Sequence, residues 1–167
     1  MAANITVIKL DHWDTDYSRP FYEMLCAYLM EDFGLRPGKE HLEQLYENIR
    51  TELDLSHIFV HLLLAWQLPV GFCISLLDTE DRPLCIRPGY GFIRDYYIRP
   101  SFRRQALGTA FFHQLCEYYR SLHAKGIYLL SSPDAFPFWT SLGFCCTDAL
   151  HGGENECCVS LDFNPSL

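Results

Sequence analysis

Apolar residues recur along the chain with two different periods, and these periods predict alternating strands and helices. Short apolar runs bounded by glycine, proline or polar residues indicate buried strands, whereas apolar residues three or four positions apart indicate helices with one buried face. The strands expected are 3–11, 57–66, 69–78, 92–98, 125–132, 145–150 and 156–163. The helices expected are 16–34, 36–53, 106–123 and 134–144.

The order of these elements is β-α-α-β-β-β-α-β-α-β-β, which predicts a mixed α/β fold with one sheet and helices on both of its faces. Hairpin turns are expected at residues 67–69 and at Gly152-Gly153. The chain has 167 residues, 49% of them hydrophobic, and shows no internal repeat or low-complexity linker. We therefore expect a single domain over residues 1–167.

Composition narrows the classes of protein and partner. No apolar stretch approaches the roughly 18 residues that span a membrane, and residues 1–16 show no basic segment followed by an apolar core. A soluble cytoplasmic protein without a membrane partner is therefore expected. The net charge of −8 argues against nucleic acid as a partner, because neutralising phosphates requires a basic face. It mildly favours cationic small molecules or basic peptides.

The eight cysteines stand singly among apolar residues or as adjacent pairs, and no Cys-x-x-Cys occurs. We expect reduced thiols that pack as small hydrophobic side chains. The alternative is a metal site that joins Cys145-Cys146 and Cys157-Cys158 through His151. Adjacent residues on a strand point to opposite faces, so at most one cysteine of each pair could be a ligand. No metal is expected.

Residues 98–110, with the sequence IRPSFRRQALGTA, concentrate positive charge where a strand gives way to a helix. The strand is expected to end at Pro100 and the helix to begin near Ala106. Consecutive backbone N–H groups at a helix N-terminus lack intrahelical partners, and together with the helix dipole they favour an anion. Arg103 and Arg104 add positive charge at the same place. A solvated helix entry that holds no ligand is the alternative.

Together with a second segment, residues 98–110 resemble the GNAT superfamily of acyl-CoA N-acyltransferases. The first motif of that family is an aliphatic strand end, a proline, and then Arg/Gln-x-x-Gly-x-Gly/Ala opening a long helix. Arg103, Ala106 and Gly108 take its three positions here. The second motif, Asn-x-x-Ala-x-x-x-Tyr-x-x-x-Gly-Phe, is matched in spacing by residues 132–144, SPDAFPFWTSLGF. The expected element order also matches the family, which implies a mostly antiparallel sheet of the GNAT type.

The resemblance implies that the chain binds acetyl-CoA and transfers its acetyl group to a primary amine of a small molecule or peptide. Backbone amides from Arg104 to Thr109 would hold the pyrophosphate, and the pantetheine arm would lie along the strand that ends at Ile98. The N–H of Ile98 would polarise the thioester carbonyl, and the amine would attack it directly, without a covalent acyl-enzyme. The coenzyme-binding residues implied are Tyr97, Ile98, Arg103, Arg104, Gln105, Ala106, Leu107, Gly108, Thr109, Ser132, Ala135, Phe138 and Trp139.

Some positions depart from the family pattern. Ala106 replaces the first glycine, and we expect it in the first helical turn, where its methyl group weakens coenzyme binding without abolishing it. Trp139 replaces the tyrosine that is often the general acid, and an indole N–H cannot protonate a thiolate. Phe92 and Arg94 stand where members of the family often supply a general base, and neither can act as one. No catalytic residue is therefore assigned.

Phe92 and Arg94 are instead candidates for binding the acceptor. Strand alternation places Phe92, Arg94 and Tyr96 on one face of the sheet and Asp95 on the other. Arg94 could hold the carboxylate of an amino-acid-like acceptor, or it could form a structural salt bridge. Asp95 is expected to be a solvated or salt-bridged strand residue.

Two other functions stay open. The missing tyrosine and the missing base favour a catalytically inactive coenzyme-A-binding or regulatory module of the same fold. An O-acyl or longer-chain acyltransferase on the same scaffold is the third hypothesis. The acceptor pocket is expected from the two N-terminal helices and residues 78–90, which the family varies most. The exposed final hairpin and the sheet edge are compatible with a homodimer.

Overall fold

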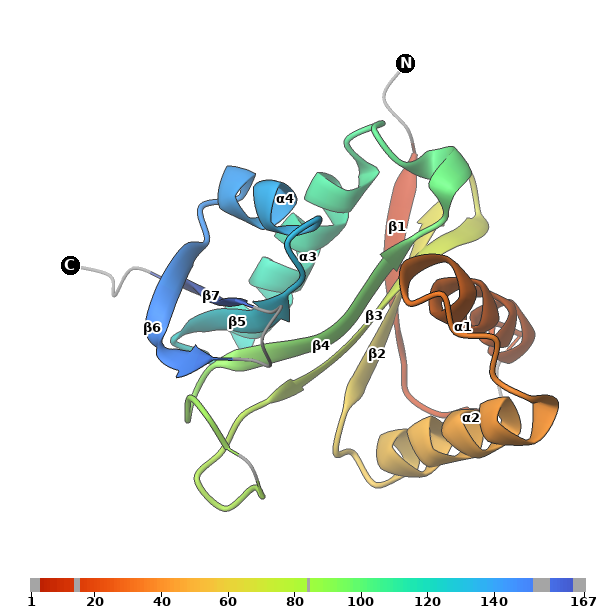
Figure 1. Cartoon of the computed structure of the whole chain (residues 1–167), viewed down its shortest axis with the longest axis horizontal. Helices are drawn as coiled ribbons and strands as arrows, with labels where there is room; N and C mark the ends of the chain where they lie inside the picture. Colours follow the sequence, from red (N-terminus) through yellow and green to blue (C-terminus); the bar gives the residue numbers. More distant parts are fainter. Residues whose placement is uncertain (1–3, 14–15, 84, 152–156, 164–167) are drawn as a thin grey trace. The chain divides into compact units, whose positions relative to one another are not determined.

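The structure is a computed structural model that describes residues 4–13, 16–83, 85–151 and 157–163. Over these residues the strands and helices follow one another in the predicted order (Figure 1). The strands are β1 (Ile5–Leu10), β2 (Phe59–Ala65), β3 (Leu68–Leu77), β4 (Gly91–Ile98), β5 (Gly126–Ser131), β6 (Cys145–His151) and β7 (Cys157–Asp162). The helices are α1 (Ser18–Asp32), α2 (Lys39–Asp54), the 3₁₀ helix η1 (Pro100–Phe102), α3 (Leu107–Ser121) and α4 (Phe136–Ser141).

The strands form one mixed seven-stranded sheet in the order β1-β2-β3-β4-β5-β7-β6. β1 pairs antiparallel with β2, β7 pairs antiparallel with both β5 and β6, and β4 pairs parallel with β5. The predicted fold class is therefore confirmed. The register of β4 with β5 is short, because it covers only Gly91–Ile93 against Ile127–Leu129 although β4 runs on to Ile98.

The chain divides into two compact units, which are considered one at a time. The first contains the described residues up to Ile74 together with Asp95–Phe111. The second contains Ser75–Arg94 and the described residues from Phe112 onward. The boundaries fall inside β3, β4 and α3, so each of these elements contributes residues to both units.

The core of the first unit lies between α1 and the sheet. Apolar residues at helical spacing give α1 one buried stripe, which consists of Phe21, Met24, Leu25 and Tyr28. The rings of Phe21 and Tyr28 pack edge-on against Phe72 of β3, with centroids 5.1 and 5.5 Å away. The helix ends before Gly34, whose φ of +62° lets the N–H of Leu35 return to the carbonyl of Leu29.

The turn between β2 and β3 lies one residue earlier than predicted. β3 begins at Leu68, so Leu68 and Pro69 belong to the strand rather than to the turn. Trp66 and Gln67 form the turn, with φ values of +50° and +65°. Positive φ at both central residues matches the twist of the flanking strands, and such turns usually contain glycine or asparagine. Trp66 and Gln67 adopt the same conformation here although neither is one of these residues.

The second unit buries the middle of β5 and one stripe of α3. Leu115 and Tyr119 of α3 and Ile127 of β5 have no exposed surface. The O–H of Tyr119 donates to the carbonyl of Leu76 at 3.1 Å, so this buried phenol has its hydrogen-bond partner. The first residue of β5, Gly126, must be a glycine, because a Cβ there would lie 2.3 Å from the carbonyl oxygen of Leu161.

The cysteines correct one prediction. Cys146 of β6 and Cys157 of β7 form a disulfide, with Cα atoms 6.6 Å apart, so the expectation of reduced thiols was wrong for this pair. The two strands are out of regular register between Cys146 and His151, and the disulfide links the two sides of that irregularity. Among the described residues the other cysteines form no disulfide, as expected. Cys73, Cys116 and Cys158 are buried, but Cys145 is exposed, so the expected packing was wrong for Cys145. The predicted turn at Gly152-Gly153 lies outside the described residues.

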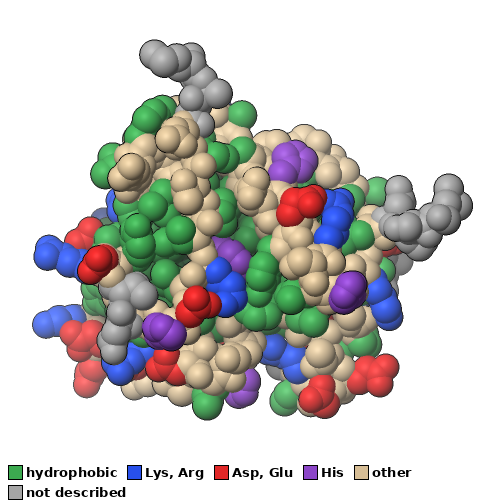
Figure 2. Space-filling view, turned by 180° about the vertical axis from the view of Figure 1, so that it is seen from behind, with side chains coloured by type: hydrophobic (Ala, Val, Ile, Leu, Met, Phe, Trp, Pro, Cys, Tyr) green, Lys and Arg blue, Asp and Glu red, His purple; other side chains and the backbone are tan. Residues whose placement is uncertain are grey.

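Charged side chains of both signs are dispersed over the face of the molecule drawn in Figure 2, with histidines and apolar side chains between them. The exposed large apolar residues are Met30, Phe33, Leu35, Leu55, Trp66 and Leu68. No helix in the described part of the chain is long and apolar enough to cross a membrane.

Candidate functional site

The segment between β4 and α3 is a tight turn followed by an exposed loop. Pro100 opens the 3₁₀ helix, in which the N–H groups of Phe102 and Arg103 donate to the carbonyls of Arg99 and Pro100, at 2.9 and 3.1 Å. Arg103, Arg104, Gln105 and Ala106 are all exposed, and the buried Leu107 is the first residue of α3. The chain therefore reverses at the end of the sheet and enters the helix through an open loop.

Two residues of this loop, Arg104 and Ala106, have left-handed backbone conformations, with φ values of +60° and +59°. Residues with positive φ that alternate with residues of negative φ turn successive N–H groups toward one side, which creates a concavity for an anion. The prediction that Ala106 lies in the first helical turn was wrong, because α3 begins only at Leu107. The left-handed conformation explains physically why the family motif has glycine at this position.

The backbone N–H groups of this segment are uncommitted. Ala110 is the first residue of α3 whose N–H reaches an acceptor, the carbonyl of Ala106 at 3.0 Å. Among the described residues no acceptor faces the N–H groups of the preceding residues, Arg104 to Thr109. A row of free amides at the positive end of a helix can bind a diphosphate.

The end of β4 directs one further N–H group away from β3. The N–H of Arg99 donates to the carbonyl of Val70 at 2.8 Å. Successive N–H groups along an extended strand point to opposite edges, so the N–H of Ile98 points to the edge away from β3. The register of β4 with β5 ends at Ile93 and does not use this N–H.

Tyr97 and Arg103 are engaged by α1. The phenol of Tyr97 is buried, and its O–H donates to Glu31 Oε2 at 3.0 Å. Burial raises the pKa of Tyr97, and the bond to Glu31 raises it further, so the phenol stays protonated at neutral pH. The Arg103 guanidinium lies 3.4 Å from Asp32 Oδ1 and 3.8 Å from Glu31 Oε2. Gln105 closes the loop from the other side, with Nε2 donating to the carbonyl of Ser101 at 3.0 Å.

Side chains in the second half of β4 alternate between two helices. The O–H of Tyr28 in α1 donates to Asp95 Oδ1 at 3.1 Å, so Asp95 faces α1. Tyr96 faces α3, because its O–H donates to the carbonyl of Gly108 at 2.5 Å and its ring stacks on Phe111. Asp95 is thus a paired strand residue, and burial together with its carboxylate raises the pKa of Tyr28.

In the first half of β4, the residue that faces α3, Gly91, stands at an odd-numbered position, whereas Tyr96 stands at an even-numbered one. The ring of Tyr119 in α3 lies against Gly91, where a Cβ would come within 2.5 Å of the ring. Five positions separate Gly91 from Tyr96, so a regular strand would place them on opposite faces. Both nevertheless face the same stripe of α3, which means that the alternation shifts by one residue between them. The prediction that Phe92 shares a face with Tyr96 was therefore wrong.

The candidate acceptor residues Phe92 and Arg94 are half-buried. The ring of Phe92 stacks on Tyr128 of β5, with centroids 4.8 Å apart and planes inclined by 28°. Arg94 also has interactions with its surroundings. Their role in binding an acceptor stays a prediction.

The second motif lies in the second unit. Ser132 is exposed, and its carbonyl accepts the N–H groups of Ala135 and Phe136, which turns the chain into α4. Phe138 is half-buried. Trp139 is only 4% exposed, and its ring packs against Phe138, Phe112 and Phe144 at 4.9, 5.8 and 5.3 Å. The indole that replaces the family's tyrosine is thus part of an aromatic core.

Sequence reasoning missed Asp78, which organises the segment between β3 and β4. The side chain is 2% exposed, and Oδ2 accepts the N–H groups of Ile86 and Arg87 and the O–H of Tyr128, at 2.8, 2.9 and 2.7 Å. Desolvation alone would raise the pKa of this carboxyl, but the hydrogen bonds outweigh it and hold the pKa below its ordinary value. An aspartate directly after an apolar strand was the only signal in the sequence.

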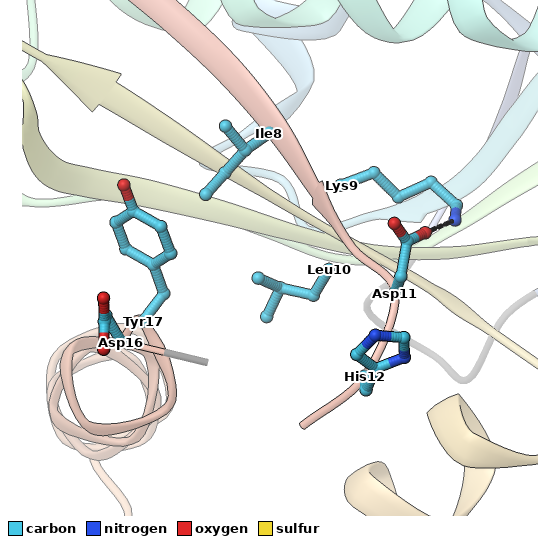
Figure 3. Close-up of a pocket in the computed structure, with 7 residues that line it drawn as sticks. All are labelled: Ile8, Lys9, Leu10, Asp11, His12, Asp16 and Tyr17. Carbon is cyan, nitrogen blue, oxygen red and sulfur yellow. Dashed lines mark hydrogen bonds and ion pairs between the residues drawn. The ribbon is translucent and has the colours of Figure 1, made fainter. Parts of the chain in front are cut away.

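An open hollow of about 480 Å³ lies in the first unit, where β1 leads toward α1 (Figure 3). Ile8, Leu10 and Tyr17 supply its apolar wall, and the close-up shows Lys9 bonded to Asp11, at 2.6 Å. None of its lining residues belongs to the predicted coenzyme site. In the described ranges no group of three or more His, Cys, Asp or Glu side chains is placed to hold a metal ion.

Replacing Ala106 by glycine is expected to raise the free energy of unfolding by about 1 kcal/mol, because an L-residue in the left-handed region is strained. Thermal unfolding should show a melting temperature about 2–4 °C higher. Ala110→Gly, in the first turns of α3, is the matched control, and it should be destabilising by a similar amount. An Ala106→Gly protein that is no more stable than the wild type would contradict the strained loop.

The chain is similar to known acetyltransferases in sequence and in fold. Residues 11–144 match the model of the acetyltransferase (GNAT) family. The chain is 35% identical over 78 residues to a glucosamine 6-phosphate N-acetyltransferase of Trypanosoma brucei brucei, and the match covers 46% of this chain and 53% of that protein. The chain thus spans about half the length of this relative.

Solved structures of acetyltransferases have the same fold. An acetyltransferase from Thermus thermophilus superimposes with a TM-score of 0.74 at 15% identity, over 97% of this chain and 99% of the other. The PaiA N-acetyltransferase of Thermoplasma acidophilum, in complex with coenzyme A, gives a TM-score of 0.70 at 12% identity, over 96% and 99% of the two chains. The family match covers most of the chain and includes both the strand–loop–helix segment and the second motif, so this protein belongs to the GNAT family of acetyltransferases.

Proposed function

We propose that this protein transfers the acetyl group of acetyl-CoA to a primary amine of a small molecule or peptide. The observation that carries the proposal is the row of uncommitted N–H groups from Arg104 to Thr109, in a chain of the GNAT family. A diphosphate bound there would fix the coenzyme at the end of β4. The solved relative that holds coenzyme A supports the same ligand class.

Binding of the diphosphate would rest on the main chain. The positive φ values at Arg104 and Ala106 aim the amides to one side, and the N-terminus of α3 adds the positive end of its dipole. The side chain of Arg104 is exposed and adds a positive charge beside these amides. Leu107, Gly108 and Thr109 contribute N–H groups, and Gly108 lets a ligand approach closely.

The chemical step needs little from side chains. The N–H of Ile98 would donate to the thioester carbonyl oxygen and stabilise the negative charge that develops when the amine nitrogen attacks the carbonyl carbon. The C–N bond forms, the C–S bond breaks, and coenzyme A leaves as a thiolate. The amine gives up one proton, and the thiolate takes one from water. Trp139 would have no part in this transfer, since the indole is buried and is not an acid.

The test is acetyl transfer to a panel of primary amines, with the acetylated products identified by mass spectrometry and coenzyme A separated by chromatography. Chromatography is needed because the chain's own free cysteines, including exposed Cys145, would react with a thiol reagent. We expect amine-dependent release of coenzyme A with one acetylated product per coenzyme. Incubation without amine is the control. Coenzyme binding without any transfer would contradict the proposal.

That last outcome is what the second candidate function predicts. The aromatic burial of Trp139, at the place of the family's acidic tyrosine, favours a module that binds coenzyme A without turning it over. Alcohol acceptors and longer acyl chains, added to the same panel, test the O-acyl and longer-chain hypotheses. A single domain over residues 1–167, a homodimer and a cytoplasmic location stay predictions from the sequence.

A further inference from the structure

Arg103 takes the first position of the coenzyme motif, but its side chain is already occupied. Its Nε donates to the carbonyl of Ile98 at 2.7 Å, and a terminal nitrogen lies 3.4 Å from Asp32 Oδ1 and 3.8 Å from Glu31 Oε2. Its guanidinium carbon is 5.6 Å from the centroid of the Tyr97 ring. The arginine therefore joins the last turn of α1 to the last residue of β4.

Glu31 connects Arg103 to a buried residue of β4. The same carboxylate oxygen that faces Arg103 accepts the O–H of Tyr97, a phenol that is 1% exposed. Glu31 thus bridges a buried side chain of β4 and a half-exposed side chain of the loop. Because one carboxylate contacts both Tyr97 and Arg103, it restrains the position of the loop relative to the strand more than either contact would alone. Figure 1 shows α1 beside this end of β4.

The loop that follows has few other constraints. Within it, the N–H of Arg103 donates to Pro100 and Gln105 Nε2 donates to Ser101, both of which are local contacts. The next residues, Arg104 to Ala106, are exposed and include the two left-handed conformations. Of the loop's contacts with residues that the structure describes, those with the greatest sequence separation join Arg103 to Glu31 and Asp32 of α1, some 70 positions earlier.

We propose that Arg103 is a positioning residue and not a phosphate ligand: clamped by Glu31 and Asp32, it holds the end of β4 and the start of the loop in the conformation that binds the coenzyme. The inference rests on the proposed function, since it assumes that the loop binds a diphosphate. It assigns α1, a helix of the predicted acceptor pocket, a direct part in shaping the coenzyme site. Pre-organisation of a loop raises affinity by removing the cost of ordering it on binding.

The two roles of Arg103 predict opposite effects of Glu31→Gln. If Arg103 positions the loop, the neutral amide loosens the clamp, and the dissociation constant for coenzyme A should rise by about 3- to 10-fold. If Arg103 is a phosphate ligand, removal of a competing negative charge should free it and tighten the binding. Calorimetry with coenzyme A alone measures this without any acetyl transfer. Measurements at 0.15 and about 0.5 M salt remove the general effect of net charge.

Arg103→Lys gives a second contrast. Lysine keeps the charge but lacks the planar fork that reaches Ile98 and both carboxylates together. We expect Arg103→Lys to weaken coenzyme binding nearly as much as Arg103→Gln, by about 5- to 10-fold. A phosphate ligand would instead tolerate lysine within about twofold, because an ammonium also binds phosphate. The double variant Glu31→Gln/Arg103→Gln should bind no worse than Arg103→Gln alone.

Glu23→Gln is the matched control, because Glu23 is also on α1 and pairs with an arginine, Arg19, at 3.2 Å on the surface. It should leave coenzyme affinity unchanged. Circular dichroism and melting temperatures establish that each variant is folded, and Asp32→Asn replaces Glu31→Gln if the latter does not fold. Tighter binding in the acidic-residue variants, or full affinity in Arg103→Lys, overturns the positioning role while wild-type binding upholds the proposed function. Absence of wild-type binding overturns both.

Discussion

Gly71→Ala is expected to destabilise the protein by about 3 kcal/mol and to weaken coenzyme binding at least tenfold. A Cβ on Gly71 of β3 would lie 2.6 Å from the backbone carbonyl of Tyr97 and 2.6 Å from Cδ1 of Ile98. The Ile98 side chain could turn aside, but a backbone oxygen moves only if the end of β4 moves with it. The strand end whose N–H we assign to the thioester would therefore shift.

Thermal unfolding and calorimetry with coenzyme A measure these two effects, and the melting temperature should fall by roughly 6–12 °C. Gly38→Ala is the matched control, since its Cβ would meet only the His41 side chain, at an ordinary 3.8 Å, and should change neither quantity appreciably. If Gly71→Ala is destabilised but binds coenzyme A normally, the position of the β4 end does not affect coenzyme binding. That result would contradict the role proposed for this strand end.

Asp78→Ala is expected to cost about 4 kcal/mol, because three hydrogen-bond donors would lose their shared acceptor. These donors are the N–H groups of Ile86 and Arg87 and the buried O–H of Tyr128. Asp78→Asn can return an oxygen to the same place without its charge, so it should cost less than half as much. Asp162→Asn is the control, because its carboxylate accepts the Tyr90 phenol at 3.0 Å but is largely exposed.

The same carboxylate predicts how stability depends on pH. The pKa of Asp78 lies below its ordinary value of 3.8 in the folded protein, so near that pH the unfolded chain binds more protons at this residue. Its stabilising contribution is therefore complete above the unfolded pKa and is lost as the pH falls through the folded one. Denaturant unfolding at several pH values should show the difference between wild type and Asp78→Asn shrinking below about pH 4. A difference that is constant with pH would contradict an ionised Asp78.

The hydrophobic periods of the sequence were sufficient to predict the elements and their order, because burial of one helix face or strand face leaves a repeat in the chain. Helix stop signals such as Gly34, which has φ +62°, were also readable. The loop that we propose to bind the diphosphate was singled out because proline, small residues and arginines mark a strand–loop–helix junction. The family motifs then supplied the fold type and the coenzyme class, which the family match supports.

The missed features depend on conformation or on distant partners. Nothing in the residue type of Ala106 or Arg104 reveals a positive φ, which alanine and arginine rarely adopt. The partners of Arg103 lie about 70 positions away on α1, where Glu31 and Asp32 look like an ordinary helix end. The one-residue shift in the alternation of β4 side chains could not be predicted, because the residues of β4 are equally compatible with a regular strand. Cys146 and Cys157 are joined only because β6 and β7 are neighbours.

If main-chain amides bind the diphosphate, the sequence of this loop can change during evolution without loss of the binding groups. The groups that would contact the diphosphate belong to the peptide backbone, so most substitutions at Arg104, Gln105 or Thr109 leave them in place. Only proline deletes an amide, and only residues that resist the left-handed region distort the concavity. Evolution can therefore exchange many side chains at Arg104, Gln105 and Thr109 while the proposed ligand-binding shape is inherited.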